Sequence, residues 1–428
     1  MVDIAYPIET RTLANGLRVV VSPDHTVPMV TVNLWVDVGS RHEVPGRTGF
    51  AHLFEHLMFQ GSRNVKSGEH FEALMAEGGR LNATTWFDRT NYFETLPVEA
   101  FELALWLEAD RHGHLLDAVT QENLDNQRDV VKEEKRQRYD NVPYGNALID
   151  VYATLFPEGH PYHHPTIGSM DDLDAATLDD VHTFFQTHYG PNNTVLTVVG
   201  DVDPPRAFEA VERYFGELPA ITLPPAREPQ VLEPLPEPVR LERHSEVPND
   251  RLYLAFRLPV EGAPDFDAAE IAVDILAGLS TSRLVERLVR TEQSATGVDA
   301  SAWGFVDGVS LGLFTVDIAA DHDAAAVEAA FCAELDRFAV EGPTDVELET
   351  AKAQAERWWL STLASQEQRA DLISRYTLHG DDPAYVCTYL AKVAAVTGEQ
   401  VRAAAAAYLT AQRRATVAYL TSDEESDV

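Results

Sequence analysis

A proline-rich segment near the middle of the chain divides the sequence into two parts of similar length. Residues 219–248 contain eight of the 24 prolines among the 428 residues. Proline stiffens the backbone and removes a hydrogen-bond donor, so this composition favours an extended linker over a helix or a central strand. We therefore expect a first domain at 1–218, a linker at 219–246 and a second domain at 247–428.

The two parts resemble each other in the order of their expected elements, at an offset of about 220 residues. The strands are expected from alternating apolar and polar residues. The matching pairs are a strand at 27–40 and 247–260, a helix at 49–62 and 267–280, and a closing helix and strand at 180–201 and 399–422. This order predicts an α+β fold of two homologous halves, each a largely antiparallel sheet with helices on one face.

The helix expected at 49–62 carries three proton-handling groups in an otherwise apolar run. At about 100° per residue, His52, Glu55 and His56 share one polar stripe, and the apolar side chains lie on the other side. Two imidazoles one turn apart can hold one metal ion, and a neighbouring carboxylate can take a proton from water. The order His-x-x-Glu-His is the inverzincin signature. It predicts His52 and His56 as zinc ligands and Glu55 as the general base; the alternative is a pair of histidines bonded to backbone carbonyls.

A catalytic zinc needs a third protein ligand, and the segment 120–141 offers one. As a helix, its inward stripe would consist of Leu124, Gln127, Val130 and Val131. Glu134 extends that stripe, whereas Glu133 points about 100° away toward solvent. A carboxylate in an apolar stripe is costly unless it is paired or binds a metal. We therefore predict Glu134 as the third ligand, Glu133 as a surface charge and Gln127 as a support for the ligand glutamate.

The motifs HLFEH at 52–56 and QRDVVKEEKRQ at 127–137 together resemble the pitrilysin/insulinase family of zinc peptidases, which includes the mitochondrial processing peptidase. The resemblance extends over essentially the whole chain, including the proline-rich linker and the second half. It implies two similar domains, each with a sheet of about six strands and helices on one side, and one zinc ion per chain. It also implies that two such pairs of domains enclose a chamber for peptides.

The same resemblance assigns substrate-binding positions. The segment 78–97 is similar to the family's edge strand, which adds the peptide backbone as a further strand, with Asn82 and Ala83 in contact with it. The alternative is a plain edge strand. Family members that act alone also carry an arginine followed seven residues on by a tyrosine, which bind the substrate carbonyl. Here Arg290 is present, but Gly297 occupies the tyrosine position.

Two readings follow from the missing tyrosine. Either another group of this chain replaces it, or a similar subunit without zinc ligands supplies the arginine and tyrosine. The second reading predicts a heterodimer in which this chain is the zinc-bearing half, with a homodimer as the alternative partner arrangement. Arg290 is then either a substrate-binding residue or a charge on a helix surface.

The net charge and the lengths of the apolar runs indicate which kinds of partner the chain can bind and where it is located. The net charge of −36 repels nucleic acid and anionic membranes, so we expect neither as a partner. It suits either solubility or basic substrates. The sequence shows no apolar run of spanning length and no secretory signal pattern, and Cys332 and Cys387 form no disulfide framework. A cytoplasmic location is expected. The loop histidines His160, His163 and His164 have no further ligands at metal-binding spacing.

These patterns together predict a zinc-dependent endopeptidase for unfolded peptides or protein segments, acting as the catalytic subunit of a two-subunit enzyme. One alternative is a non-catalytic family member that serves as a scaffold or peptide-binding subunit. Another is a maturation peptidase dedicated to one precursor. The complete set of expected zinc ligands favours an enzyme over a scaffold.

Overall fold

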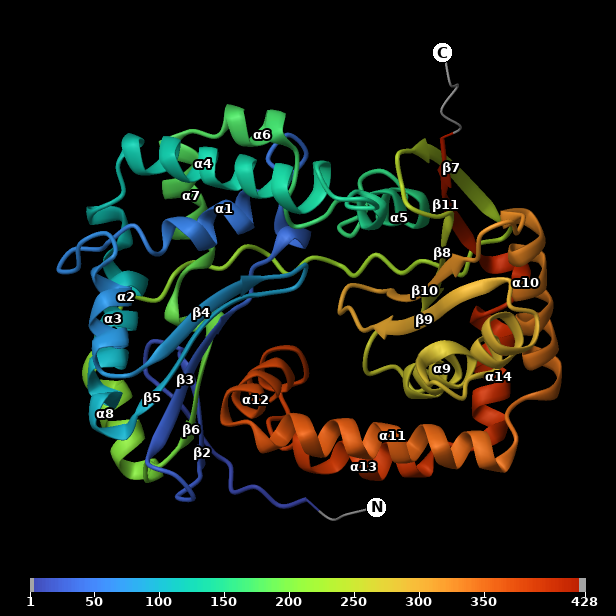
Figure 1. Cartoon of the computed structure of the whole chain (residues 1–428). Coiled ribbons are helices and arrows are strands. Elements are labelled where there is room, and N and C mark those ends of the chain that lie inside the picture. Colours follow the sequence, from blue (N-terminus) through green and yellow to red (C-terminus); the bar gives the residue numbers. More distant parts are fainter. Residues whose placement is uncertain (1–3, 423–428) are drawn as a thin grey trace. The chain divides into compact units, whose positions relative to one another are not determined.

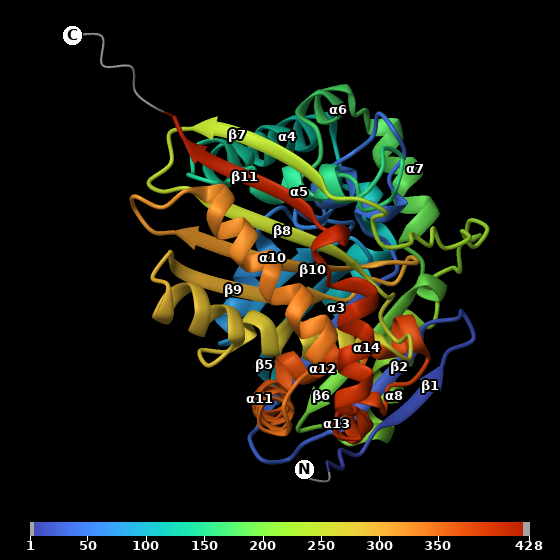
Figure 2. The ribbon, with the colours of Figure 1, turned by 90° about the vertical axis from the view of Figure 1, so that its right-hand side faces the viewer.

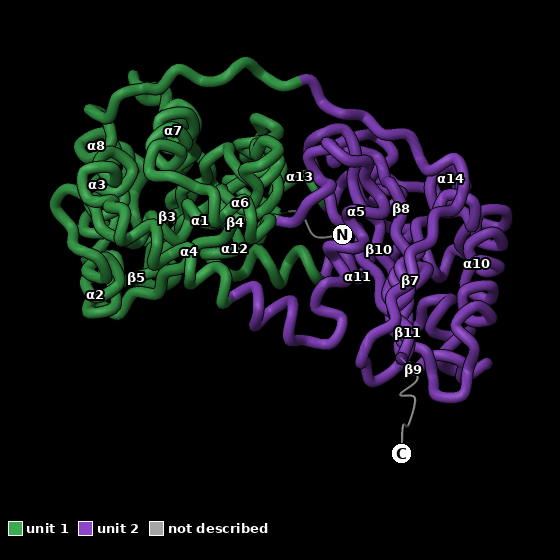
Figure 3. The backbone as a smooth tube through the Cα atoms, turned by 90° about the horizontal axis from the view of Figure 1, so that it is seen from above, with its two compact units in different colours: residues 1–133, 166–227, 358–389 green, residues 134–165, 228–357, 390–428 purple. Residues whose placement is uncertain are grey.

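The computed structural model describes residues 4–422, which form two compact units (Figure 3). In the described chain, the first unit contains residues 4–133, 166–227 and 358–389, and the second contains 134–165, 228–357 and 390–422. The predicted domains at 1–218 and 247–428 therefore need correction. Two segments cross over, since 134–165 folds with the second unit and 358–389 folds with the first.

The first unit is built on a six-stranded sheet with the order β1-β2-β6-β3-β5-β4 (Figure 1). The strands are β1 (Glu9–Thr12), β2 (Arg18–Pro23), β3 (Met29–Val36), β4 (Arg80–Thr85), β5 (Thr90–Pro97) and β6 (Thr194–Gly200). Neighbouring strands are antiparallel except β2 and β6, which are parallel. The predicted largely antiparallel sheet is confirmed, and β4 lies at its edge.

One face of this sheet is apolar. Val30, Val32 and Leu34 of β3 are fully buried on that face, in the core that also contains side chains of α3 (Phe101–His114) and α8 (Pro204–Phe215). The first unit also contains α1 (Phe50–Leu57), α2 (Glu69–Ala76), most of α4 (Gln121–Lys135), α6 (Met170–Ala175) and α7 (Leu178–His188). The strand alternation thus directs every second side chain into one continuous core.

The other face of the same sheet is polar and is covered by α12 (Gln366–Gly380) (Figure 1). The Oδ1 atom of Asp371 accepts hydrogen bonds from Trp35 Nε1 at 2.8 Å, Asn91 Nδ2 at 3.0 Å and Asn33 Nδ2 at 3.4 Å. These three donors are at most 3% exposed. A buried polar face needs such partners, which explains why a helix far along the sequence belongs to the first unit.

We expect Asp371→Leu to destabilise the first unit by about 3 kcal/mol, because it removes the acceptor of the buried Trp35 Nε1 and the nearer acceptor of Asn91 Nδ2. Asp371→Asn is the matched control, since an amide oxygen in place of Oδ1 can accept the same hydrogen bonds. The urea midpoint of unfolding measures both variants. Equal losses for leucine and asparagine would show that the acceptor is not what stabilises this packing.

The second unit contains a five-stranded sheet with the order β7-β11-β8-β10-β9, whose strands are labelled in Figure 2. The strands are β7 (Val239–Ser245), β8 (Arg251–Leu258), β9 (Ala295–Trp303), β10 (Ser310–Ile318) and β11 (Ala415–Thr421). Only β7 and β11 pair in parallel. The predicted linker at 219–246 was therefore too long: after Pro238 the chain can donate backbone hydrogen bonds again and forms β7.

The helices of the second unit surround this sheet. They include α5 (Ala147–Leu155), α9 (Phe266–Val273), α10 (Ala324–Glu341) and α14 (Gly398–Tyr408); α11 (Asp345–Ala364) and α13 (Tyr385–Ala395) contain the boundaries between units. Helix α5 is fixed to the second sheet through Asp150, which bonds Arg243 Nη2 at 2.6 Å and the Tyr419 hydroxyl at 2.8 Å. These bonds help to explain why residues 134–165, from the first half of the sequence, fold with the second unit.

Short helical turns complete the described chain. The 3-10 turns are Ser40–His42, Val98–Ala100, Leu115–Asp117, Pro191–Asn193 and Ala411–Arg413, and the π-helical turns are Arg136–Asp140, Asp274–Gly278 and Val285–Thr291. Within residues 4–422, every helix is too short or too polar to span a lipid bilayer.

Candidate active site

Helix α1 places three polar groups on one side of an apolar helix. Leu53, Phe54 and Leu57 are fully buried, whereas His52, Glu55 and His56 are partly exposed. This is the division that the sequence pattern predicts. The helix packs by its apolar residues and presents the imidazoles and the carboxylate together.

The two imidazoles face each other. His52 Nε2 and His56 Nε2 are 3.3 Å apart, and one ligand atom from each of His52, His56 and Glu134 lies within 4.8 Å of the others. Nitrogens about 2.0–2.1 Å from a tetrahedral zinc ion would lie roughly 3.3–3.4 Å from each other. The donor set of two imidazoles and one carboxylate is also one that catalytic zinc uses. The residues therefore fit a zinc ion.

Helix α4 supplies the carboxylate (Figure 1). Leu124, Gln127 and Val131 are buried on one side, Glu134 continues that side and is partly buried, and Glu133 is exposed. The predicted stripe thus holds except at Val130, which is 42% exposed because it lies beside the buried face.

The end of α4 also positions the carboxylate of Glu134. The boundary between the units falls between Glu133 and Glu134, inside the last turn of a helix whose first 13 residues belong to the first unit. Glu134 is therefore positioned by that helix. Its Oε1 atom pairs with Arg138 Nη1 at 2.6 Å, one turn further on.

The carboxylate of Glu55 is held by the edge strand. The hydroxyl of Thr85, the last residue of β4, donates a hydrogen bond to Glu55 Oε2 at 2.5 Å. This distance is typical of a hydroxyl that donates to an ionised carboxylate. No pattern in the sequence predicted this contact, because Thr85 and Glu55 belong to different elements.

A second glutamate, Glu43, caps the N-terminus of α1. The carboxylate of Glu43 accepts hydrogen bonds from the backbone N–H groups of Gly49 at 2.9 Å and Ala51 at 2.8 Å. Helix N-terminal N–H groups lack partners within the helix, so a carboxylate at this place fixes the helix that carries the histidines. Removal from water nevertheless raises the pKa of Glu43 to about 8.

This raised pKa predicts a pH-dependent stability. An acid whose pKa rises on folding contributes stability below its unfolded pKa and loses it as pH rises through the folded value. In the metal-free protein, we expect the free energy of unfolding of wild type, relative to Glu43→Gln, to fall by roughly 3 kcal/mol between pH 5 and 8. Urea unfolding at several pH values measures this difference. A constant difference would contradict the assignment.

The remaining predicted residues lie as follows. Asn82 is exposed and Ala83 is buried on β4, opposite Phe93 and Tyr92 of β5, so the edge-strand prediction is met while peptide contact stays a prediction. Gln127 is buried on the face of α4 that carries Glu134, and its supporting role also stays a prediction.

Arg290 lies in the second unit and is half-exposed. Its Nη2 donates to the Ser280 carbonyl oxygen at 2.7 Å, and its Nη1 pairs with Glu286 at 3.2 Å. The loop histidines bond backbone atoms, with His163 Nδ1 2.8 Å from the Phe156 carbonyl oxygen. Among the described residues, His52, His56 and Glu134 are the only group of histidine, cysteine and carboxylate side chains close enough together to hold one metal ion.

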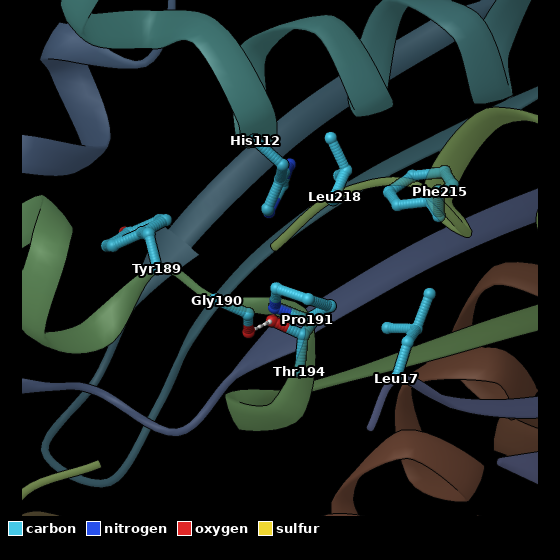
Figure 4. Close-up of a pocket in the computed structure, with 8 residues that line it drawn as sticks. All are labelled: Leu17, His112, Tyr189, Gly190, Pro191, Thr194, Phe215 and Leu218. Atoms are coloured by element: carbon cyan, nitrogen blue, oxygen red, sulfur yellow. Dashed lines mark hydrogen bonds between the residues drawn. The ribbon is translucent and has the colours of Figure 1, made fainter. Parts of the chain in front are cut away.

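A small cavity of about 10 Å³ lies elsewhere in the first unit (Figure 4). His112 extends from α3 toward Gly190 and Pro191, and the Thr194 hydroxyl donates to the Gly190 carbonyl oxygen at 2.9 Å. Its volume suffices for about one water molecule. None of the candidate zinc ligands is among its lining residues, so this cavity is separate from the candidate active site.

Two family profiles match the chain. One described as "Insulinase (Peptidase family M16)" matches residues 18–160, and one described as "Peptidase M16 inactive domain" matches residues 175–355. The first includes His52, His56 and Glu134. The second begins after all three of these residues.

Individual relatives match over most of their length. The zinc protease PqqE of Helicobacter pylori is 30% identical over 376 residues, which cover 87% of this chain and 84% of that protein. An uncharacterized zinc protease of Streptomyces coelicolor is 27% identical, covering 93% of this chain and 86% of that protein.

Solved structures share the fold. The crystal structure of a protease from Helicobacter pylori matches with a TM-score of 0.90 and 29% identity, covering 97% of this chain and 99% of that chain. A peptidase M16 inactive domain from Pseudomonas fluorescens matches with a TM-score of 0.86 and 19% identity over 97% of this chain and 98% of that chain, which shows a common fold alone.

Proposed function

Since the chain belongs to the insulinase family of peptidases, family M16, we propose that it is a zinc-dependent endopeptidase that cleaves unfolded peptides or protein segments. The observation that carries this proposal is the convergence of His52 and His56, whose Nε2 atoms are 3.3 Å apart, with Glu134. Glu55 lies on the same helix stripe, which is the arrangement that metal-assisted hydrolysis requires.

His52, His56 and Glu134 would hold the zinc ion. When bound, zinc lowers the pKa of water and polarises a carbonyl group. Glu55 is the general base, which takes the proton from the attacking water and delivers it to the leaving amine. Thr85 and Glu43 hold this machinery in place, one through the carboxylate of Glu55 and the other through the start of α1.

The edge strand suggests how a peptide is held. β4 pairs with β5 on one side only, so its other edge offers backbone groups to an extended peptide. Asn82 and Ala83 would contact that peptide. Backbone pairing reads little sequence, which suits unfolded segments better than one folded target.

We extend the proposal to the subunit arrangement. Arg290 is engaged by Ser280 and Glu286 within the second unit, and Gly297 in β9 supplies no hydroxyl. A similar subunit that provides an arginine and a tyrosine would complete the site in a heterodimer. A non-catalytic scaffold is the rival function, and the retained donor set of His52, His56 and Glu134 argues against it.

Cleavage of an unstructured, quenched fluorescent peptide by the purified chain tests the proposal, with Glu55→Gln and chelator-treated protein as blanks. Zinc-dependent cleavage above both blanks supports a complete peptidase. A chain that holds one zinc ion but does not cleave supports the two-subunit arrangement. A chain that binds no zinc under conditions that preserve its fold contradicts the proposed function.

A further inference from the structure

We propose that Thr85 is a positioning residue that aligns the carboxylate of Glu55 and couples the general base to the peptide-docking edge strand. This inference rests on the proposed function, because it assigns a role within the same site. The contact itself is direct: the Thr85 hydroxyl donates to Glu55 Oε2 at 2.5 Å.

The hydroxyl of Thr90, which is the neighbour of Thr85 across the strand pair, donates its hydrogen bond to another residue. Thr90 Oγ1 donates to the Val38 carbonyl oxygen at 2.8 Å and lies 3.4 Å from Thr85 Oγ1. Because a carbonyl oxygen can only accept, the proton of Thr90 is used on Val38. Thr90 therefore does not donate to Thr85, and Glu55 Oε2 at 2.5 Å is a much nearer acceptor for the Thr85 proton than Thr90 Oγ1 at 3.4 Å.

The backbone around Thr85 is held in place by its neighbours. Thr85 pairs with Thr90 at the end of the β4–β5 ladder, and Arg89 Nη1 donates to the Thr84 carbonyl oxygen at 2.9 Å. The Thr84 hydroxyl bonds Asn91 Oδ1 at 2.6 Å. The hydroxyl that meets Glu55 is therefore carried by a fixed backbone, as an orienting group requires.

The same strand carries the predicted peptide contacts. Asn82 and Ala83 precede Thr85 by three and two positions on β4. The strand β4 would consequently position both the peptide that pairs with it and, through Thr85, the carboxylate of Glu55. Since general-base catalysis depends on the placement of the base relative to the scissile bond, this link sets kcat more than substrate affinity.

Two substitutions at Thr85 test the role. Thr85→Val keeps the shape and removes the donor, and we expect it to lower kcat by about tenfold to a hundredfold, with KM changed less than about twofold. Thr85→Ser returns the hydroxyl and should restore most of the lost kcat. Zinc content, measured by mass spectrometry, should be equal in all three proteins. Wild-type kcat in Thr85→Val, or an equal loss in Thr85→Ser, would overturn the assignment.

A second measurement does not depend on activity. In the metal-free full chain, Thr85→Val should lower the melting temperature when Glu55 is present and lower it less, or not at all, in a Glu55→Ala background. Equal shifts in both backgrounds would overturn the inference whatever the peptide assay shows. Failure of the folded wild type to bind zinc, together with background-dependent shifts, would instead reject the proposed function and retain the Thr85–Glu55 pair.

Discussion

Glu55→Gln is expected to lower kcat by about a hundredfold to ten-thousandfold while the chain still binds one zinc ion. Glutamine keeps the size of the side chain and can accept the Thr85 hydrogen bond, but it cannot take a proton from water. The substitution changes only Glu55 on α1, so the imidazoles of His52 and His56 remain available to bind the metal. Peptide cleavage and the zinc content of the same sample measure the two parts of this expectation.

A surface glutamate provides the matched control for this change. Glu72 is exposed on α2, so Glu72→Gln removes the same charge without touching the site. It should keep the wild-type rate. Equal turnover of Glu55→Gln and wild type would remove Glu55 from the mechanism, and loss of zinc in Glu55→Gln would show that the glutamate acts on the metal instead.

The local parts of this site could be predicted from the sequence because helix periodicity is a local property. The spacing of apolar residues placed His52 on the polar stripe of α1 and Glu134 on the inward face of α4. Only Val130 departed from the expected stripe. The family followed from the motifs on these helices, and the α+β class followed from the repeated order of expected strands and helices. Relatives and the two sheets confirm both.

The parts that escaped prediction depend on contacts between distant residues. Asp371 and Trp35 are 336 positions apart, and no periodic pattern links a helix to the polar face of a sheet formed so much earlier. The same holds for Thr85, which is 30 positions from Glu55. The Glu43 contact is closer in sequence, but it spans a loop in which no periodic pattern exists. The proline content also led to a linker prediction that included β7, although the last proline of the predicted linker, Pro238, precedes this strand.

Glu134→Gln is expected to weaken zinc binding by at least about a hundredfold, a larger loss than Glu55→Gln should cause. A hundredfold change corresponds to about 2.7 kcal/mol of binding free energy. The carboxylate supplies both the ligand oxygen and a negative charge beside the metal, and a neutral amide replaces neither. Competition with a chromophoric chelator measures the affinity, and the rise in melting temperature on adding zinc should shrink in parallel.

Glu133, the residue before Glu134, provides the matched control for this prediction. Glu133 precedes Glu134 on α4, carries the same charge, and is exposed where Glu134 is partly buried. Glu133→Gln should therefore bind zinc as wild type does, because one helical position turns its side chain about 100° away from His52 and His56. If Glu133→Gln lost zinc and Glu134→Gln retained it, the third ligand would be assigned to the wrong face of the helix. Equal small effects of both changes would point to long-range charge rather than coordination.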